Sequence, residues 1–268
     1  MSANVSANLT GEKNVPVLEM QNVEKHFGGV HAIDNFSVKI EDGQIHGLIG
    51  PNGAGKTTIF NNITGIYAPD SGKILFFGRD ITGTAPHKVA RLGIGRTFQN
   101  IRLFSNLPVL DNVIIASSRD ASYNMPQAIF ATKKYKEREQ YLKDKAMSLL
   151  DEVGLADKAG EIASSLPYGH QRKLEIARAM ALEPKLLLLD EPAAGMNAEE
   201  SLDLVNFVKD IRDKFKITIL MIEHHMDVVT NLCDYCTVLN FGKTIAVGTP
   251  AEVKRDPEVI RAYLGGTD

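Results

Sequence analysis

Residues 50–58 have the types and the spacing of a loop that holds phosphate groups. They fit the Walker A pattern Gly-x-x-x-x-Gly-Lys-[Ser/Thr], a motif of nucleotide-binding proteins. Glycine takes positive φ and lets the backbone approach an anion without a Cβ in the way, so that successive N–H groups can point inward. We call this segment the phosphate loop, and its residues are Gly50, Pro51, Asn52, Gly53, Ala54, Gly55, Lys56, Thr57 and Thr58.

The neighbouring residues support this interpretation of the phosphate loop. Residues 45–49 read as a buried strand and residues 57–64 as a helix, and the motif requires a strand, a glycine-rich turn and a helix in that order. A helix that starts near Lys56 adds the positive end of its dipole, and the Lys56 ammonium is a point charge for the β- and γ-phosphates. The Thr57 hydroxyl can ligate Mg²⁺. The sequence therefore predicts an ATP site.

Two carboxylates end a continuous apolar run later in the chain. Residues 185–189 predict a parallel strand buried on both faces, and Asp190 and Glu191 follow it directly. Because a buried carboxylate without a partner is costly, these acids are expected in a site. A second buried strand, residues 217–222, ends in Glu223, His224 and His225. Adjacent histidines are expected to point in different directions, which argues against zinc.

Three other features leave their roles open at this stage. Gln99 follows a strand-like run and, taken alone, reads as a solvated loop amide. Phe27 stands beside a turn between two strands and is either a core aromatic or a flat platform for a base. Gly169 is expected just before a helix, whose start would be another anion-receptive N-terminus.

The elements that must position these residues follow from hydrophobic periodicity and from turn residues. Residues 17–23 and 33–40 predict half-buried antiparallel strands, with residues 25–29 between them, and residues 72–78 predict a strand that ends in a turn. Residues 120–131 lack clear periodicity and carry apolar residues that look exposed. A hairpin is expected over residues 237–247. Helices are expected over residues 86–92, 109–118, 133–153, 199–214, 250–255 and 257–264.

Composition excludes several classes of function. The chain has 268 residues, 44% of them hydrophobic and 24% charged, which suits one large α/β domain or one domain with a small helical insert. The net charge is −3 without a basic stripe, so nucleic-acid binding has no electrostatic support. No apolar run approaches the roughly 18 residues of a membrane span. Residues 1–14 lack the apolar core of a signal peptide and are expected to form a flexible tail, so we expect a soluble, cytoplasmic protein.

The two cysteines, Cys233 and Cys236, stand in a single C-x-x-C pair without a second ligand pair. Their surroundings look like a helix running into a buried strand. Reduced thiols in the core are therefore a better interpretation than zinc or redox chemistry.

Taken in order, the phosphate loop, Gln99, residues 166–170, Asp190 with Glu191, and His224 make the chain resemble an ABC transporter ATPase subunit. The resemblance covers residues 17–265. Residues 95–99, 166–169, 190–197 and 260–265 are similar to the Liv-type ATPases of branched-chain amino acid importers, and residues 120–135 are similar to the larger ATPase of that system. The implied fold is α/β: a P-loop NTPase core with a mixed sheet, an antiparallel β subdomain and an α-helical subdomain inserted at about residues 100–165, in one domain of residues 15–268.

The resemblance implies roles that these residues can perform chemically. Phe27 would stack on adenine, while Lys56 and the amides of the phosphate loop would hold the phosphates. The implied Mg²⁺ set is Thr57, Gln99 and Asp190. The implied catalytic residues are Glu191 as general base, His224 as γ-phosphate sensor, and Gln99.

A further motif of the family acts on the ATP of a partner subunit. We call it the signature segment, and its residues are Leu166, Pro167, Tyr168, Gly169 and His170. The general pattern is Leu-Ser-Gly-Gly-Gln, so Pro167 removes a hydroxyl and a backbone N–H, Tyr168 replaces a glycine and His170 replaces the glutamine. Met196 and Asn197 stand where Leu-Asp is usual, which puts the role of Asn197 in doubt.

The implied partners are two transmembrane permease subunits and a second ABC ATPase, with a heterodimer favoured over a homodimer, at the cytoplasmic face of the cell membrane. A periplasmic or extracellular substrate-binding protein would take part indirectly, and no nucleic acid is expected. Urea-type importers share many of these features. Lipopolysaccharide or lipid export, and a soluble ABC ATPase in translation or DNA repair, are the alternatives; the insert, the single cassette and the short helix over residues 133–153 argue against them.

Overall fold

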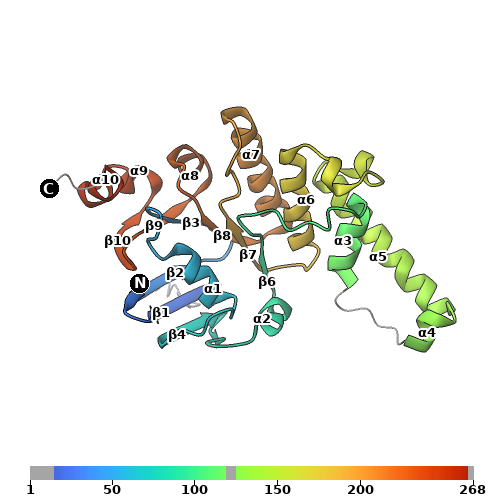
Figure 1. The fold of residues 1–268 in the computed structure, drawn as a ribbon, viewed down its shortest axis with the longest axis horizontal. Coiled ribbons are helices and arrows are strands. Elements are labelled where there is room, and N and C mark those ends of the chain that lie inside the picture. Colours follow the sequence, from blue (N-terminus) through green and yellow to red (C-terminus); the bar gives the residue numbers. More distant parts are fainter. Residues whose placement is uncertain (1–14, 119–124, 265–268) are drawn as a thin grey trace, which may run out of the picture.

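The computed structural model describes residues 15–118 and 125–264. The flexible tail predicted for residues 1–14 lies outside these described residues. The chain forms two sheets with helices around them (Figure 1). The predicted α/β class with a mixed sheet and a separate antiparallel sheet is confirmed.

The larger sheet has six strands in the order β10-β9-β3-β8-β7-β6. Neighbours from β9 to β6 run parallel, and β10 pairs antiparallel with β9. The strands are β3 (Ile45–Ile49), β6 (Ile94–Arg96), β7 (Leu186–Asp190), β8 (Thr218–Ile222), β9 (Tyr235–Asn240) and β10 (Lys243–Gly248). The strands β3, β7 and β8 are buried along their whole length, as expected for parallel strands covered on both faces.

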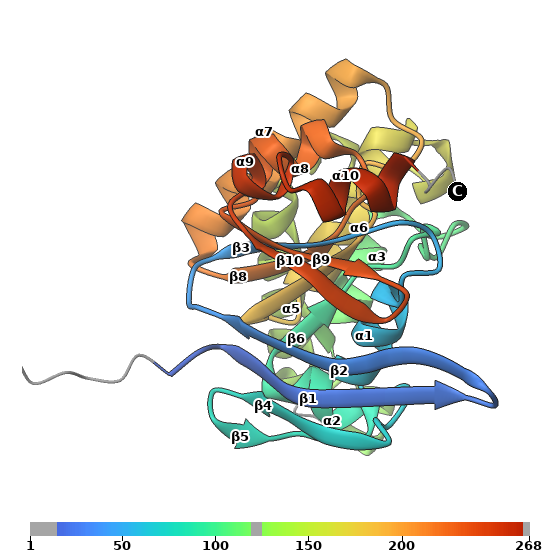
Figure 2. The same ribbon diagram turned by 90° about the vertical axis from the view of Figure 1, so that its left-hand side faces the viewer.

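Alternate residues of these strands face opposite sides of the sheet. Leu187 and Leu189 belong to one hydrophobic cluster, and Leu186 and Leu188 belong to the other. Figure 2 shows helices α7 to α10 on one side of the larger sheet, while α1 lies on the other side, between the two sheets. The carboxyl ends of β3, β7 and β8 are thereby fixed by core on both faces.

The smaller sheet has the order β2-β1-β4-β5 and is antiparallel throughout. Its strands are β1 (Leu18–Phe27), β2 (Val30–Ile40), β4 (Ser71–Phe76) and β5 (Arg79–Asp80). The prediction that residues 25–29 form the connection is wrong, because β1 continues to Phe27, which pairs with Val30. Only Gly28 and Gly29 remain as the turn, and Gly28 takes φ 57°.

The helices that cover the sheets are α1 (Lys56–Ile63), α2 (Pro86–Leu92), α7 (Ala198–Phe215), α8 (Met226–Leu232), α9 (Pro250–Val253) and α10 (Pro257–Leu264). Asn197 caps α7: its side chain accepts from the Glu200 N–H, and the Glu200 carboxylate accepts from the Asn197 N–H. This capping box gives Asn197, whose role the sequence left in doubt, a structural function.

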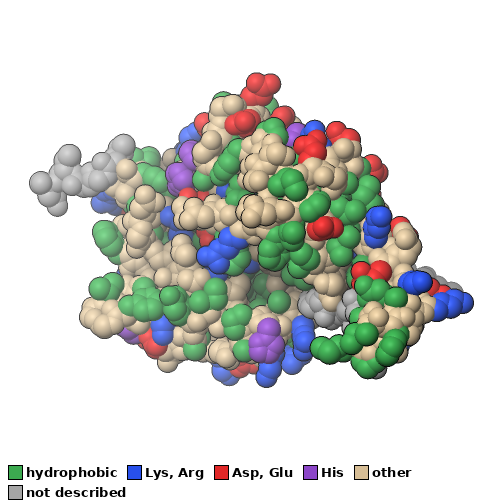
Figure 3. Space-filling view, turned by 45° about the vertical axis from the view of Figure 1, so that its right-hand side comes forward, with side chains coloured by type: hydrophobic (Ala, Val, Ile, Leu, Met, Phe, Trp, Pro, Cys, Tyr) green, Lys and Arg blue, Asp and Glu red, His purple; other side chains and the backbone are tan. Residues whose placement is uncertain are grey.

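Between β6 and β7 the described residues form helices that project to one side (Figure 1). They are α3 (Val109–Ser117), α4 (Met125–Ile129), α5 (Lys133–Glu152), the 3-10 turns Ala156–Lys158 and Ala163–Ser165, and α6 (Tyr168–Met180). The helix α4 lies in the stretch that lacks clear periodicity. Met125, Ile129 and Phe130 are exposed there, and Figure 3 shows hydrophobic side chains gathered over this end of the molecule.

Cys233 and Cys236 are free and buried, which confirms the expectation that they lie in the core. A Cβ added at Gly47 would lie 2.9 Å from the Cys233 sulfur, so the glycine makes room for it. Among the helices that the structure describes, none is long and apolar enough to cross a bilayer.

Candidate active site

The phosphate loop joins β3 to α1, in the order that the motif requires. Gly55 stands at the N-cap of α1 with φ 104°, and Gly50 has φ 147°. A Cβ at Gly50 would lie 2.1 Å from the Leu239 carbonyl oxygen, and one at Gly55 would lie 2.4 Å from that of Ala32. Glycine is therefore required at both positions by the backbone conformation and by the close approach of neighbouring backbone.

Lys56 is the first residue of α1 and its side chain is buried. Its Nζ donates to the carbonyl oxygens of Gly50 at 2.6 Å and Pro51 at 2.9 Å, so the ammonium is held at the loop. Burial lowers the pKa of Lys56, while the charges of Glu191, Asp190 and Glu223 act in the opposite direction. The loop therefore combines a positive charge with three nearby carboxylates, which suits an anion bound together with a cation.

Asp190 is the last residue of β7 and is buried. Its Oδ2 lies 3.0 Å from Nη2 of Arg96, and burial raises the pKa of Asp190 while this hydrogen bond and the charge of Arg96 oppose the rise. Arg96 also donates to Asn61 and Thr64 at the end of α1. Arg96 thus fixes one carboxylate oxygen of Asp190 and connects β6 and β7 to α1.

Glu191 follows Asp190 and takes the left-handed conformation, with φ 47°. Gln99 Nε2 donates to Glu191 Oε2 at 2.8 Å, and His224 Nδ1 lies 3.8 Å from the same oxygen. Residues from the ends of β7 and β8 and from the loop after β6 therefore meet at one carboxylate. A carboxylate oriented in this way is suited to act as a general base toward water.

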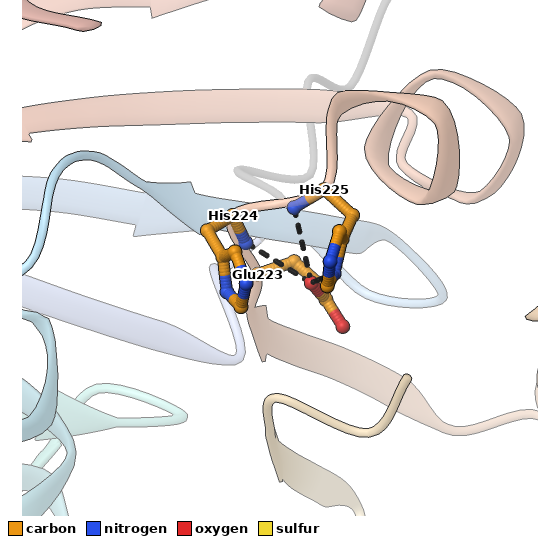
Figure 4. A group of neighbouring side chains, drawn as sticks. All are labelled: Glu223, His224 and His225. Carbon is orange, nitrogen blue, oxygen red and sulfur yellow. Dashed lines mark hydrogen bonds and ion pairs between the residues drawn. The ribbon is translucent and has the colours of Figure 1, made fainter. Parts of the chain in front are cut away.

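Glu223, at the end of β8, is fully buried and has no role that the sequence predicts. Its Oε1 accepts from the Ala193 N–H, and its Oε2 accepts from the N–H groups of His224 and His225 (Figure 4). The expectation that the two histidines point in different directions is wrong, because their ring centroids lie 4.1 Å apart. One carboxylate that gathers both backbone N–H groups holds the two residues together, and Glu223 thereby sets the position of His224.

Phe27 ends β1 with 42% of its surface exposed, so it is not a core aromatic. Its ring meets Tyr67 edge-on with centroids 5.2 Å apart, and Lys25 Nζ lies 5.6 Å from its centroid. An exposed, supported ring face can stack on a flat ligand.

The signature segment leads into α6, which begins at Tyr168 rather than after Gly169 as expected. Pro167 is the N-cap and makes no side-chain capping bond, so it provides neither of the groups that a serine would offer. Gly169 and His170 consequently lie in the first helical turn. The Tyr168 hydroxyl donates to the Ala194 carbonyl oxygen at 3.0 Å, a contact that the sequence did not indicate.

The residues proposed for Mg²⁺ are chemically suited to it. A hydroxyl from Thr57, an amide oxygen from Gln99 and a carboxylate oxygen from Asp190 are hard oxygen ligands of the kind that Mg²⁺ prefers. Gln99 uses its nitrogen toward Glu191, which leaves the amide oxygen as the ligating atom. Arg96 donates only to Oδ2 of Asp190, so the other carboxylate oxygen is left for the ion. The donor set therefore fits the ion.

Family models match two parts of this chain. Residues 33–194 match the ABC transporter model, and residues 243–268 match the model of the branched-chain amino acid ATP-binding cassette transporter.

Curated relatives match over nearly the whole chain. The high-affinity branched-chain amino acid transport ATP-binding protein BraF of Pseudomonas aeruginosa is 42% identical over 93% of this chain and 98% of its own length. The corresponding LivG of Escherichia coli strain K12 is 40% identical with the same coverage. A crystal structure of an ABC transporter's ATP-binding cassette in its ADP conformation has a TM-score of 0.82 and 32% identity, covering 94% of this chain and 99% of its own. A crystal structure of a nucleotide-free ATP-binding cassette from an ABC transporter has a TM-score of 0.81 and 32% identity. The match covers 94% of this chain and 100% of the other.

Proposed function

This chain belongs to the family of ABC transporter ATPases, and we propose on that premise that it is the ATP-hydrolysing subunit of a branched-chain amino acid importer. The observation that carries hydrolysis is the convergence of Gln99 and His224 on one oxygen of Glu191, beside the phosphate loop's lysine and Asp190. The names of the relatives, which state branched-chain amino acid transport, support the choice of substrate.

Binding of ATP would use three groups of this chain. The exposed ring of Phe27 would stack on adenine, and the N–H groups at the start of α1 would donate to the phosphates. Lys56 Nζ, now donating to two carbonyl oxygens, would donate to phosphate oxygens instead, because charged acceptors form stronger hydrogen bonds. Thr57, Gln99 and Asp190 would hold Mg²⁺, which when bound neutralises charge that develops on the phosphates.

Hydrolysis would proceed with Glu191 as general base. Its carboxylate would accept a proton from water while the water oxygen bonds to the γ-phosphorus, the bond from that phosphorus to the β–γ bridging oxygen breaks and ADP leaves. Gln99 would help to orient the attacking water. His224, held by the Glu223 carboxylate beneath it, would donate toward the γ-phosphate. Glu223 is therefore a positioning residue for the His224 sensor.

The substitution Glu191→Gln tests this assignment. General-base assistance is worth about 10²–10⁴-fold, so the ATP turnover of the assembled complex should fall by about that factor. Binding of a fluorescent ATP analogue should stay within about twofold of wild type, since the phosphate loop is unchanged. Turnover near the wild-type rate would remove Glu191 from the catalytic role.

Transport requires chains that cross the membrane, and no described helix of this protein can do so. We infer that it lies at the cytoplasmic face of the cell membrane, bound to two permease subunits near Gln99 and the helices that follow β6. A periplasmic or extracellular binding protein would deliver the substrate to the permeases. The inserted helical subdomain would cover about residues 100–165 of a single ATPase domain, residues 15–268.

The ATPase pair is proposed as a heterodimer in which this chain's signature segment is the weaker one. Pro167 lacks the hydroxyl and the N–H of the usual serine, and loss of one charge-assisted hydrogen bond costs about 1.5–3 kcal/mol. Disabling the general-base glutamate of each subunit in turn would test the asymmetry. The ATP site on this chain's phosphate loop, which the partner's fuller signature segment completes, should account for most of the ATPase activity. Equal losses of ATPase activity in the two variants would contradict the proposal.

A further inference from the structure

Tyr168 makes contacts that its place in the signature segment does not require. As the first residue of α6 it is 41% exposed, yet its ring lies against Gly195, where an added Cβ would be 3.9 Å from ring atoms. Its hydroxyl donates to the Ala194 carbonyl oxygen at 3.0 Å. The signature segment is thereby attached to the loop that follows Glu191.

Arg172 connects Tyr168 to the Gln99 loop. One turn further along α6, Arg172 is fully buried and its Nη2 donates to the Tyr168 hydroxyl oxygen at 3.2 Å. The same guanidinium donates to the carbonyl oxygens of Phe98 at 2.9 Å and Gln99 at 3.0 Å. Its ion pair with Glu175 at 2.7 Å compensates the buried charge.

The contacts close into a ring. The Ala194 N–H donates to the Glu191 carbonyl oxygen at 3.1 Å, and Glu191 accepts from the Gln99 side chain. The Gln99 carbonyl oxygen accepts from the Arg172 guanidinium, and the same guanidinium donates to the Tyr168 hydroxyl oxygen. One circuit of hydrogen bonds therefore includes the general base, the glutamine beside it and the first turn of the signature helix.

The Tyr168 hydroxyl is the member of this ring that the general signature cannot supply. That pattern has glycine at this position, and glycine has no side chain to reach Ala194. The aromatic ring alone would pack on Gly195 without any hydrogen bond to the loop. The hydroxyl therefore adds a direct hydrogen bond between the signature segment and the loop that follows Glu191.

We propose that Tyr168 is a positioning residue whose hydroxyl couples this chain's own ATP site to the signature segment that it presents to its partner. The inference rests on the proposed function, because it takes the phosphate loop as an ATP site. When Mg·ATP draws Gln99 and Glu191 into new contacts, the Ala194 carbonyl and the Arg172 guanidinium shift with them. Tyr168 transmits that shift to the first turn of α6.

The substitution Tyr168→Phe removes the hydroxyl and keeps the ring, so packing on Gly195 persists. Tyr141→Phe is the matched control, since Tyr141 lies on α5 with 52% of its surface exposed and its ring against Arg138. Both variants should bind a fluorescent ATP analogue within about twofold of wild type. In the assembled complex, Tyr168→Phe should lower turnover by about fivefold, the equivalent of one neutral hydrogen bond, with KM within about twofold.

Amide hydrogen exchange on the full-length chain gives a readout that does not depend on turnover. Adding Mg·ATP should change exchange both over residues 191–197 and over residues 168–173 in wild type and in Tyr141→Phe. In Tyr168→Phe the change over residues 168–173 should be clearly smaller, because only the Arg172 contact with the Gln99 loop remains, while the change over residues 191–197 persists. An ATP response over residues 168–173 that is the same in all three proteins, or absent from wild type although ATP binds, would overturn the coupling. A wild-type chain that binds no ATP would instead overturn the proposed function.

Discussion

Glu191 holds a backbone conformation that a residue with a Cβ seldom takes. Its φ of 47° costs on the order of 1–3 kcal/mol, and the surrounding contacts must compensate for it. The Glu191 N–H donates to the Ile222 carbonyl oxygen, and the Ala194 N–H donates to the Glu191 carbonyl oxygen. The strain is thus held where the proposed chemistry takes place, and it turns the carboxylate toward Gln99 and His224.

Removing the cation of the buried Arg96–Asp190 pair is predicted to destabilise the fold more than breaking an exposed pair does. Arg96→Met leaves a buried carboxylate without its cation, which costs about 3–5 kcal/mol of unfolding free energy. Lys39→Met breaks the exposed pair with Glu19 and should cost about 0–1 kcal/mol. Urea denaturation measures both. Equal losses for the two variants would show that Asp190 does not depend on Arg96.

The sequence motifs predicted the residues expected to act on ATP. They did not predict the arginines that fix those residues in place through hydrogen bonds. Arg96 stands 94 positions from Asp190, and Arg172 stands 73 positions from Gln99. An isolated arginine in a strand or a helix looks like a solvated residue until the fold shows its partners. A guanidinium with several donors is nevertheless suited to join distant loops, which is the one signal that could have suggested them.

At the scale of elements, the buried strands were predictable because a continuous run of about five apolar residues is typical of a parallel strand covered on both faces. The end of β1 was not predictable, because Lys25 and His26 look like turn residues. In the structure they pair with Ile33 and His31 of β2. The dipeptide Gly28-Gly29 is a two-residue hairpin signal that could have corrected the boundary. Helix α4 is too short for its period to be read from sequence.

His46 gives a pH-dependent prediction that belongs to the contact between β3 and β9. Its Nε2 lies 2.9 Å from the Thr237 hydroxyl, and burial lowers the pKa of His46 to about 4. The unfolded chain therefore binds the proton first, near its pKa of 6.5, so folding stability falls as pH drops from 6.5 to 4. The loss due to this group reaches about 3 kcal/mol.

Denaturation at about pH 7 and about pH 4.5 tests the role of His46, since these values lie on either side of most of its titration. The variant His46→Gln should lose less stability between these pH values than wild type does. His87→Gln, at an exposed position on α2, should follow wild type. If His46→Gln and wild type show the same acid dependence, His46 is not the group responsible.

At the scale of the whole molecule, the fold separates two sets of groups that we propose act on different nucleotides. The carboxyl ends of β3, β7 and β8 lead directly into the phosphate loop, Glu191 and Glu223, and all three strands are neighbours in one sheet. The signature segment instead starts α6, beyond the helices that follow β6. The phosphate loop is therefore half of an ATP site in the proposed assembly, and the partner's signature segment completes it.

The central claim is that ATP hydrolysis at Glu191 drives the uptake of branched-chain amino acids. The most direct measurement is the uptake of labelled leucine by cells that lack this chain and are complemented with wild type or with Glu191→Gln at equal expression. Wild type should restore leucine uptake, Glu191→Gln should leave it at the level of the deletion, and arginine uptake should be unchanged throughout. Leucine uptake that survives the deletion undiminished, or that Glu191→Gln restores in full, would contradict the claim.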